Sequence, residues 1–288
     1  MARPPLRGCA PLWGALTLLA LALPARADGR PSLAGSRRWI AFYGTTLSLK
    51  AWKTLDLAVL DPDAFELPSS SGPLRLAYVS AGEADEKRSY WPQVQGKPYL
   101  VESNPDWPEA HRVDIRSDAW RRLLLKEVIP KALAKGYDGV FLDTLDTAEY
   151  LQSRDTAAYA GSMDAAKGLV EALRAQYPDK LILLNNALPL LEGLADAADG
   201  VVVEDLYTRC DPHAKACVPT PPEVSAAKEA TLLRWKEKTG KPVFVLLYSD
   251  LRGRDSHPLR KAARRCLKNG FFPYLTLPSL MSLGRVAP

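Results

Sequence analysis

The sequence lacks a strong excess of either charge, an internal repeat and any long apolar run beyond its amino-terminal segment. The formal net charge is +5, and Arg3, Arg7 and Arg26 all lie within Met1–Ala27, so +5 less these three leaves +2. A chain so close to neutral has no global electrostatic reason to bind nucleic acid or an anionic membrane surface. No later apolar run is long enough to cross a bilayer.

The segment Met1–Ala27 has the pattern of a secretory signal peptide. An apolar run over Leu12–Leu23 follows two arginines, and Ala25-Arg26-Ala27 offers a small-residue cleavage site. We expect cleavage between Ala27 and Asp28, a secreted or periplasmic protein, and no membrane attachment afterwards. An uncleaved anchor helix is the alternative. Residues 28–288 then form one domain, of the length that an α/β barrel needs, and we expect it to be a monomer.

Eight segments have the composition of strands buried on both faces, because they are apolar throughout rather than alternating. They are Trp39–Tyr43, Leu57–Leu60, Leu74–Ser80, Gly139–Asp143, Leu181–Asn185, Gly200–Glu204, Val243–Tyr248 and Phe271–Thr276. Helical patterns lie between the later ones, over Ser117–Lys135, Asp155–Gln176, Pro222–Thr239 and His257–Lys268. This alternation predicts a parallel sheet closed into a single (β/α)8 TIM barrel.

The connection from Ser80 to Ser117 is long, rich in Pro, Trp and acids, and has no helical periodicity. We expect an irregular loop after the third strand. A loop of this length inside a compact domain is usually functional. Because it leaves the carboxyl end of a strand, it lies over the face where barrels place their chemistry.

Polar residues gather at the predicted strand ends. They are Tyr43, Asp61, Tyr78, Glu83, Asp143, Asp146, Asn185, Asn186, Glu204, Tyr207 and Tyr248. Histidine, cysteine and lysine do not recur there, which disfavours a Ser-His or Cys-His nucleophile, a Schiff-base lysine and a zinc site. Oxygen groups and aromatic rings suit a sugar, and Trp91 and Trp107 of the long loop are candidate stacking platforms.

Two acids stand out because each directly ends an apolar strand. Asp143 follows Gly139-Val140-Phe141-Leu142, and Glu204 follows Gly200-Val201-Val202-Val203. Glycoside hydrolases use such a pair of carboxyl groups as their catalytic residues. We expect Asp143, in the polar setting of Thr144 and Asp146, to stay ionised. We expect Glu204, after three valines, to be the protonated acid, since burial raises the pKa of a carboxyl group.

Three cysteines follow the predicted signal peptide. Cys210 and Cys217 bracket a short polar segment after Glu204, and export makes a local disulfide plausible. A metal site that uses both thiols with His213 is the alternative, although the spacing fits no common zinc pattern. Cys266 lies in a helical pattern, where we expect a buried, unpaired side chain.

From Trp39 to Ser282 the chain resembles the TIM-barrel proteins of glycoside hydrolase family 114. The resemblance is carried by Ala77–Glu83 (AYVSAGE), Lys135–Asp146 (KGYDGVFLDTLD), Leu184–Asn186 (LNN) and Val203–Leu206 (VEDL). It implies an endo-α-1,4-polygalactosaminidase-like activity on an α-linked amino-sugar polysaccharide, with no cofactor or metal, and with Asp143 and Glu204 as the catalytic pair. It also implies substrate-binding roles for Tyr43, Asp61, Tyr78, Glu83, Asn186 and Tyr248. We add Trp91, Asp146 and Tyr207 to the substrate-binding candidates.

Two other classes remain open at this point. A non-catalytic carbohydrate-binding barrel would keep the aromatic residues without needing paired acids. A metal-dependent hydrolase would use Asp61, Glu83, Asp143 and Asp250 as oxygen ligands. The segment from Cys210 to Cys217 has no place in the family pattern.

Overall fold

The computed structural model describes residues 29–211, 216–249 and 257–286. The predicted signal peptide, its cleavage point, His213 and Asp250 lie outside these residues. Within the described ranges, no helix combines the length and the apolar composition that a membrane span requires.

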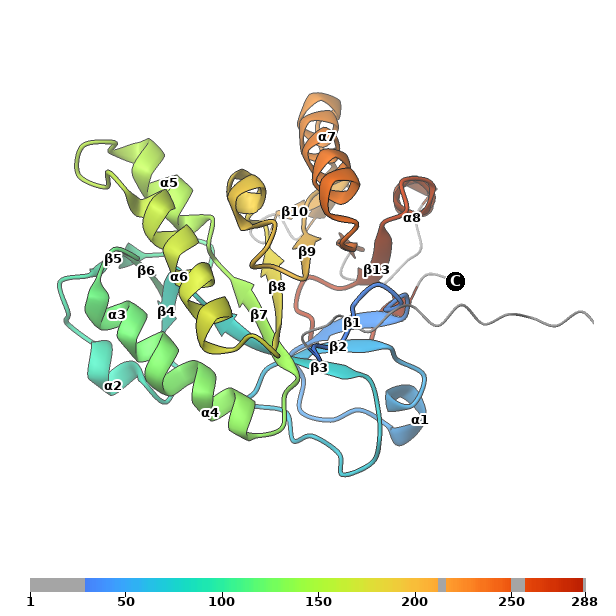
Figure 1. Cartoon of the computed structure of the whole chain (residues 1–288). Helices are drawn as coiled ribbons and strands as arrows, with labels where there is room; N and C mark the ends of the chain where they lie inside the picture. Colours follow the sequence, from blue (N-terminus) through green and yellow to red (C-terminus); the bar gives the residue numbers. More distant parts are fainter. Residues whose placement is uncertain (1–28, 212–215, 250–256, 287–288) are drawn as a thin grey trace, which may run out of the picture.

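Eight parallel strands form a nearly closed barrel, as predicted (Figure 1). In spatial order they are β1 (Trp39–Phe42), β2 (Leu57–Leu60), β3 (Leu74–Ser80), β7 (Gly139–Asp143), β8 (Leu181–Asn185), β9 (Gly200–Val203), β12 (Val243–Tyr248) and β13 (Phe272–Thr276). Their order in the sheet follows their order in the chain, as right-handed βαβ crossovers require. The fold is therefore a (β/α)8 barrel.

Side chains rather than a hydrogen-bonded ladder join the first and last strands. The Trp39 indole Nε1 donates to the Phe272 carbonyl at 2.8 Å, and its ring lies 5.6 Å from that of Tyr274. The short strand β14 (Arg285–Val286) pairs antiparallel with β13. Beyond the strands, the Tyr43 amide donates to the Leu280 carbonyl at 2.9 Å, which brings the two strand ends together.

Alternation along each strand divides the apolar residues into two cores. In β7, Phe141 packs inside the barrel, whereas Val140 and Leu142 pack outward beneath the helices. In β8, Leu181 and Leu183 belong to the interior in the same way. Because the period is two, Asp143 and Asn185 continue the inward rows at the carboxyl ends of their strands.

The helices cover the outside of the barrel, mostly where the sequence predicts them. They are α1 (Leu49–Trp52), α3 (Asp118–Leu123), α4 (Ile129–Ala134), α5 (Thr147–Arg154), α6 (Ser162–Gln176), α7 (Pro222–Thr239) and α8 (His257–Lys268), with a 3-10 segment at Leu188–Leu194. A π-helical turn at Leu124–Val128 joins α3 to α4 just before Pro130, which has no N–H to donate. The prediction of one helix over Asp155–Gln176 was wrong at its start, because α6 begins only after Gly161, whose φ is +81°.

The long connection after β3 is more ordered than an irregular loop. It forms a small antiparallel sheet in the order β4 (Glu83–Asp85), β6 (Ala110–Val113), β5 (Leu100–Ser103). A one-turn helix, α2 (Trp91–Val94), precedes β5. The predicted position over the carboxyl end of β3 holds, since only Ala81 and Gly82 separate β3 from β4.

A disulfide-linked hairpin follows β9. Strands β10 (Thr208–Asp211) and β11 (Ala216–Pro219) pair antiparallel with Cys210 opposite Cys217, and the two cysteines form a disulfide. This confirms the predicted disulfide and not the alternative, a metal site that uses both thiols. Cys266 is buried and unpaired, also as predicted.

Candidate active site

Three neighbouring strands end in the same way, with an inward polar side chain followed by a residue in the left-handed region. Thr144, Asn186 and Asp205 have φ values of +61°, +48° and +53°, and each directly follows Asp143, Asn185 or Glu204. Non-glycine residues in this region carry strain of about 1 kcal/mol or more each, and such strain gathers at functional sites. The repeated kink turns the chain away from the barrel immediately after each of the three side chains.

The backbone around Asp143 is held by the connection that leaves β3. The Gly82 amide and the Ser80 hydroxyl both lie within hydrogen-bond distance of Thr144 Oγ1, at 2.8 and 2.9 Å. A Cβ on Gly82 would lie 2.1 Å from the Thr144 carbonyl oxygen. Only glycine therefore permits this close approach, which gives the Ala-Gly-Glu segment after β3 a physical role.

The Asp143 carboxylate accepts three hydrogen bonds. Oδ1 accepts from the Thr144 backbone amide at 2.8 Å and from Asn185 Nδ2 at 2.7 Å. Oδ2 accepts from the Tyr78 hydroxyl at 2.9 Å. Oδ2 therefore keeps more free lone-pair capacity than Oδ1, as the attacking oxygen of a nucleophile must.

Glu204 accepts hydrogen bonds on both carboxyl oxygens. Asn185 Nδ2 donates to Oε1 at 2.6 Å, and the Tyr248 hydroxyl donates to Oε2 at 2.6 Å. The backbone of Glu204 is also fixed, because its amide donates to Asn186 Oδ1 at 2.9 Å and Lys228 Nζ donates to its carbonyl at 3.2 Å.

One amide nitrogen thus touches both acids. Asn185 Nδ2 lies 2.7 Å from Asp143 Oδ1 and 2.6 Å from Glu204 Oε1. Two oxygens that accept from the same nitrogen at such lengths are separated by about 5 Å or less. Two carboxyl groups this close cannot both be ionised without mutual repulsion. The predicted pair therefore meets inside one site.

The environment favours the neutral form of Glu204. Loss of hydration and, next, the negative charge of Asp143 raise the pKa of Glu204 to about 7, despite the opposing hydrogen bonds from Tyr248 and Asn185. Part of the residue reaches solvent, but the carboxyl group itself lies in the barrel mouth among Asp143, Asn185 and Tyr248, where burial has the larger effect.

Two tyrosines line the same mouth. The ring of Tyr43 lies 4.9 Å from that of Tyr78 in an edge-to-face arrangement. Burial, together with the charges of Asp143 and Glu204, raises the pKa of the Tyr43 phenol well above its usual value. Within the described part of the chain its hydroxyl makes no hydrogen bond, so this group is available to a substrate.

Further acids surround the pair. Enclosure and the charge of Asp143 raise the pKa of Asp146 to about 7; because the residue as a whole is exposed, the neighbouring charge matters more here than burial. Glu83 is buried and accepts from Asn104 Nδ2 at 3.0 Å and from the Thr147 hydroxyl at 3.1 Å. Burial raises the pKa of Glu83. Asp146 therefore adds to the acidic character of the mouth, whereas Arg112, 3.9 Å from Glu83 Oε1, offsets the charge of the buried Glu83.

Asp61 is committed to an ion pair at the edge of the site. Its Oδ1 lies 2.7 Å from Arg88 Nη1, and the guanidinium also contacts Asp63 at 3.1 Å. The Arg88 guanidinium carbon lies 5.5 Å from the centre of the Tyr78 ring. Asp61 therefore contacts Arg88 rather than the acid pair, and Arg88 in turn lies against the ring of Tyr78.

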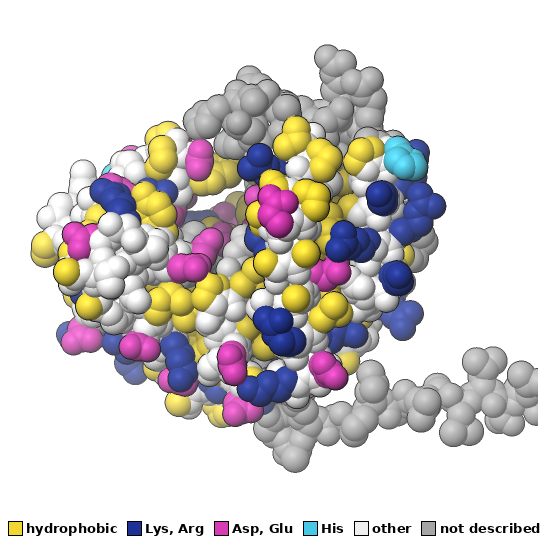
Figure 2. Space-filling model, turned by 90° about the horizontal axis from the view of Figure 1, so that it is seen from above, with side chains coloured by type: hydrophobic (Ala, Val, Ile, Leu, Met, Phe, Trp, Pro, Cys, Tyr) yellow, Lys and Arg dark blue, Asp and Glu magenta, His cyan; other side chains and the backbone are white. Residues whose placement is uncertain are grey.

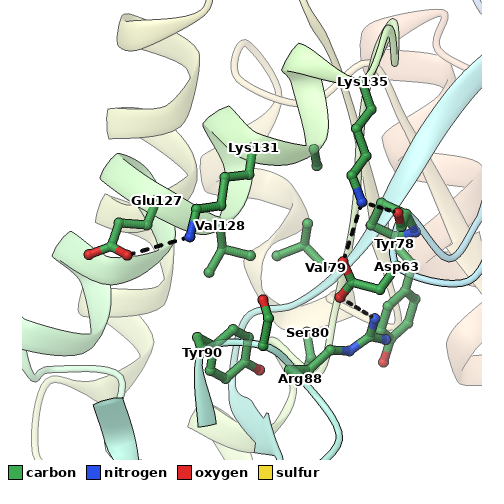
Figure 3. A pocket seen from close by; sticks show the side chains of 13 residues that line it. Asp63, Tyr78, Val79, Ser80, Arg88, Tyr90, Glu127, Val128, Lys131 and Lys135 are labelled. Atoms are coloured by element: carbon green, nitrogen blue, oxygen red, sulfur yellow. Dashed lines mark hydrogen bonds and ion pairs between the residues drawn. The ribbon is translucent and has the colours of Figure 1, made fainter. Parts of the chain in front are cut away.

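Figure 3 shows a small hollow beside this ion pair, between β3 and α4. Its lining includes Asp63, Tyr78, Arg88, Lys131 and Lys135. The hollow has room for at least one water molecule. It lies on the outer side of β3 and shares Tyr78 with the acid pair.

Trp91 and Tyr207, two predicted substrate-binding residues, lie among other partners. The ring of Trp91 stacks on His111 at 4.9 Å. The Tyr207 hydroxyl donates to Glu229 of α7 and accepts from Asn269 Nδ2 at 3.2 Å. The structure does not bring either side chain to the acid pair. Trp107, by contrast, is 58% exposed.

The sequence-based selection named Asn186 but missed its neighbour. Asn186 supports the Glu204 backbone, whereas Asn185 bridges the acids and is 1% exposed. The signal was present, because Asn185 continues the inward row of Leu181 and Leu183. Across the described ranges, no cluster of three or more His, Cys, Asp or Glu side chains is arranged to hold a metal ion.

The site around Asp143 and Glu204 opens to solvent at the carboxyl ends of the strands. Strands β7, β8 and β9 point upward in Figure 1, so Figure 2 looks onto these ends. It shows a hollow with acidic side chains along its wall. An α/β barrel with paired carboxyl groups at this face has the construction of a glycoside hydrolase.

Comparison with known proteins agrees with this class. The chain belongs to glycoside-hydrolase family GH114, whose sequence profile matches residues 26–287. An uncharacterised protein of Deinococcus radiodurans is 29% identical over 275 residues, covering 88% of this chain and 84% of the relative. Membership favours the hydrolase over the carbohydrate-binding and metal-dependent alternatives.

Two solved structures share the fold. The glycoside hydrolase domain of PelA from Pseudomonas aeruginosa aligns with a TM-score of 0.75 and 24% identity, covering 88% of this chain and 99% of that one. Ega3 of Aspergillus fumigatus, solved with galactosamine, aligns with a TM-score of 0.67 and 18% identity, covering 90% and 97%.

Proposed function

We propose that this protein is an exported endo-acting hydrolase of an α-linked amino-sugar polysaccharide, with Asp143 as nucleophile and Glu204 as general acid. The observation that carries the proposal is the shared contact of both carboxyl groups with Asn185 Nδ2, which limits the separation of their nearest oxygens to about 5 Å. Retaining glycosidases place the two groups about 5 to 5.5 Å apart, whereas inverting ones need about 6.5 to 9.5 Å to admit a water molecule. A closest approach this short leaves little room for a water molecule between the two groups, so we propose retention.

The proposed reaction has two steps. Glu204 gives its proton to the glycosidic oxygen while Asp143 Oδ2 bonds to the anomeric carbon, so the leaving sugar departs as an alcohol and a glycosyl ester remains. Ionised Glu204 then takes a proton from water, whose oxygen attacks the anomeric carbon and releases Asp143 as a carboxylate. The pKa of Glu204, raised to about 7, supports its role as proton donor at neutral pH.

The amino-sugar specificity rests on charge. Asp143 and Asp146 give the mouth an acidic lining, which attracts a protonated amine and repels an acidic sugar. The galactosamine held by Ega3 supports the same substrate class. Asp146 and Tyr43 are the best placed of the predicted binding residues, because an exposed carboxyl group and an unoccupied phenol can both meet a sugar. The other predicted binding residues hold the acids or their surroundings: Tyr78 donates to Asp143, Tyr248 and Asn186 hold Glu204, and Asp61 pairs with Arg88.

Export is supported by the disulfide between Cys210 and Cys217, because such bonds persist in oxidising compartments. The predicted signal peptide remains the basis for cleavage before Asp28. Amino-terminal sequencing of protein recovered from outside the cytoplasm tests this directly. An amino terminus that retains Met1–Ala27 would contradict it.

The activity test uses the chain from Asp28 onward with partially deacetylated α-1,4-galactosaminan. We expect mass spectrometry to detect new oligomers, and proton NMR to show that the first product has the α configuration. Asp143→Asn and Glu204→Gln should each lose at least about a thousandfold in rate. Asp118→Asn is the matched control, since that carboxyl group is 84% exposed on α3. Full turnover by both site variants would refute the assignment.

A further inference from the structure

Asn185 is the single side chain, among the described residues, that donates a hydrogen bond to both members of the acid pair. Each of the other donors contacts only one of the two acids. Tyr78 and the Thr144 amide serve Asp143, and Tyr248 serves Glu204. Each N–H of the Asn185 amide therefore has one acid to itself, and nothing remains for a third partner.

The orientation of this amide follows from chemistry. If the group were turned over, its carbonyl oxygen would face two carboxyl oxygens at hydrogen-bond distance, which is repulsive. In the observed orientation Oδ1 is buried and has no hydrogen-bond partner among the residues that the structure describes. A buried carbonyl oxygen without a hydrogen bond costs free energy of folding. The observed orientation carries this cost and points both N–H groups at the acids.

We propose that Asn185 is a positioning residue that stabilises the negative charge on whichever of the two acids carries it during turnover. This inference rests on the proposed hydrolase function. Before the first step the charge is on Asp143, and in the glycosyl ester it is on Glu204. The pair carries one negative charge in both states. An amide that donates to both acids faces the charged partner in each state without moving, which is the property of a preorganised dipole.

Asn185 does not touch the substrate in this role. Its side chain is 1% exposed, because it lies beneath the two acids at the end of β8. Its effect must therefore pass through the acids, and their titration is the readout. The charged and titratable groups around Glu204 are Asp143 on β7, Asp205 beside it, Tyr43 after β1, Tyr248 on β12 and Lys228 on α7.

The first experiment needs no substrate. Carboxyl groups of the folded protein are labelled with carbon-13 and titrated by NMR, and Glu204→Gln identifies the resonance of Glu204. Asn185→Leu keeps the side-chain size and removes both N–H donors. Because these donors favour the ionised form, we expect the pKa of Glu204 to rise by about one to two pH units. An unchanged or lower pKa of Glu204 would overturn the proposal.

The second experiment follows hydrolysis against pH. In Asn185→Leu we expect kcat to fall by about a hundredfold to a thousandfold, with the basic limb of the pH profile moved upward. Gln176→Ala is the control, because Gln176 Nε2 also makes two hydrogen bonds, at 3.0 Å each, away from the barrel mouth. It should leave both limbs in place. A merely structural Asn185 would lower the rate without moving either limb.

The two experiments separate failure of this inference from failure of the proposed function. If the wild-type protein cleaves no amino-sugar polymer, the hydrolase proposal fails, whereas the titration still reports whether Asn185 acts on both acids. If the wild type is active and Asn185→Leu titrates like the wild type, the inference alone fails. Asn185→Ala, which admits water in place of the amide, serves as the second variant if the leucine variant does not fold.

Discussion

Replacing Asp143 by asparagine should stabilise the fold at alkaline pH by an amount that the site geometry sets. The nearest oxygens of Asp143 and Glu204 both accept from Asn185 Nδ2. Two unit charges about 5 Å apart, at an effective dielectric constant of about 20, repel by about 3 kcal/mol. Below pH 7 the pair carries one charge and there is little repulsion to remove. Above pH 7 both groups are ionised and the repulsion is present in full.

The sign follows from proton linkage. Glu204 has a pKa of about 7 in the folded protein and about 4.3 when unfolded. The folded state therefore binds more protons between these values, and the free energy of unfolding falls as pH rises through this window. Removing the charge of Asp143 lowers the folded pKa of Glu204, so much of that decline should disappear. Asp146, whose pKa is also raised by Asp143, adds to the effect in the same direction.

The assay is urea unfolding of the wild type and Asp143→Asn at pH 5.5 and pH 8.5. Asparagine also weakens the hydrogen bonds from Tyr78 and Thr144, but this cost is present at both pH values and cancels in the difference. We expect the variant to gain about 1 to 2 kcal/mol relative to the wild type between the two conditions, because burial, which the substitution does not remove, causes part of the raised pKa of Glu204. Asp118→Asn should gain nothing. An equal stability change at both pH values would refute the close coupling of the two acids.

Three further predictions concern the same site and its surroundings. Tyr248→Phe removes a donor to the ionised form of Glu204, so the basic limb of the rate profile should move upward, and a limb moved downward would contradict the contact. Reduction of the Cys210–Cys217 disulfide should lower the unfolding free energy by about 2 kcal/mol, measured by urea unfolding with and without reductant. EDTA should leave the hydrolysis rate unchanged, and a loss restored by added metal ions would return the metal-dependent hydrolase to consideration.

The barrel was predictable because its strands are buried on both faces. Short, continuous apolar segments such as Val201–Val203 are typical of strands buried in a parallel sheet. The eight predicted segments match the eight strands closely. The segment after β3 was not predictable as a sheet. Its pairings join residues as far apart as Glu83 and Arg112, and short strands with mixed composition carry no periodic signal.

At the site, the alternation of residues along each strand already distinguishes the inward side chains from the outward ones. Phe141 precedes Asp143 by two positions, and Leu183 precedes Asn185 by two, so both polar residues belong to the inward row. Asn186 is adjacent and chemically identical, but period two directs it elsewhere. Tyr207 could not be placed in this way, because its partner Glu229 lies on a helix 22 residues later. Only the three-dimensional packing of α7 decides that contact.

The joint between β1 and β13 has a consequence for biosynthesis. Trp39 and the Phe272 carbonyl that it contacts are 233 positions apart. At about 5 to 20 residues per second, the ribosome needs on the order of ten seconds or more to supply the second after the first. Throughout that interval the nascent Trp-Ile-Ala-Phe segment has no eighth strand beside it. The barrel can therefore close only after nearly the whole chain has been made.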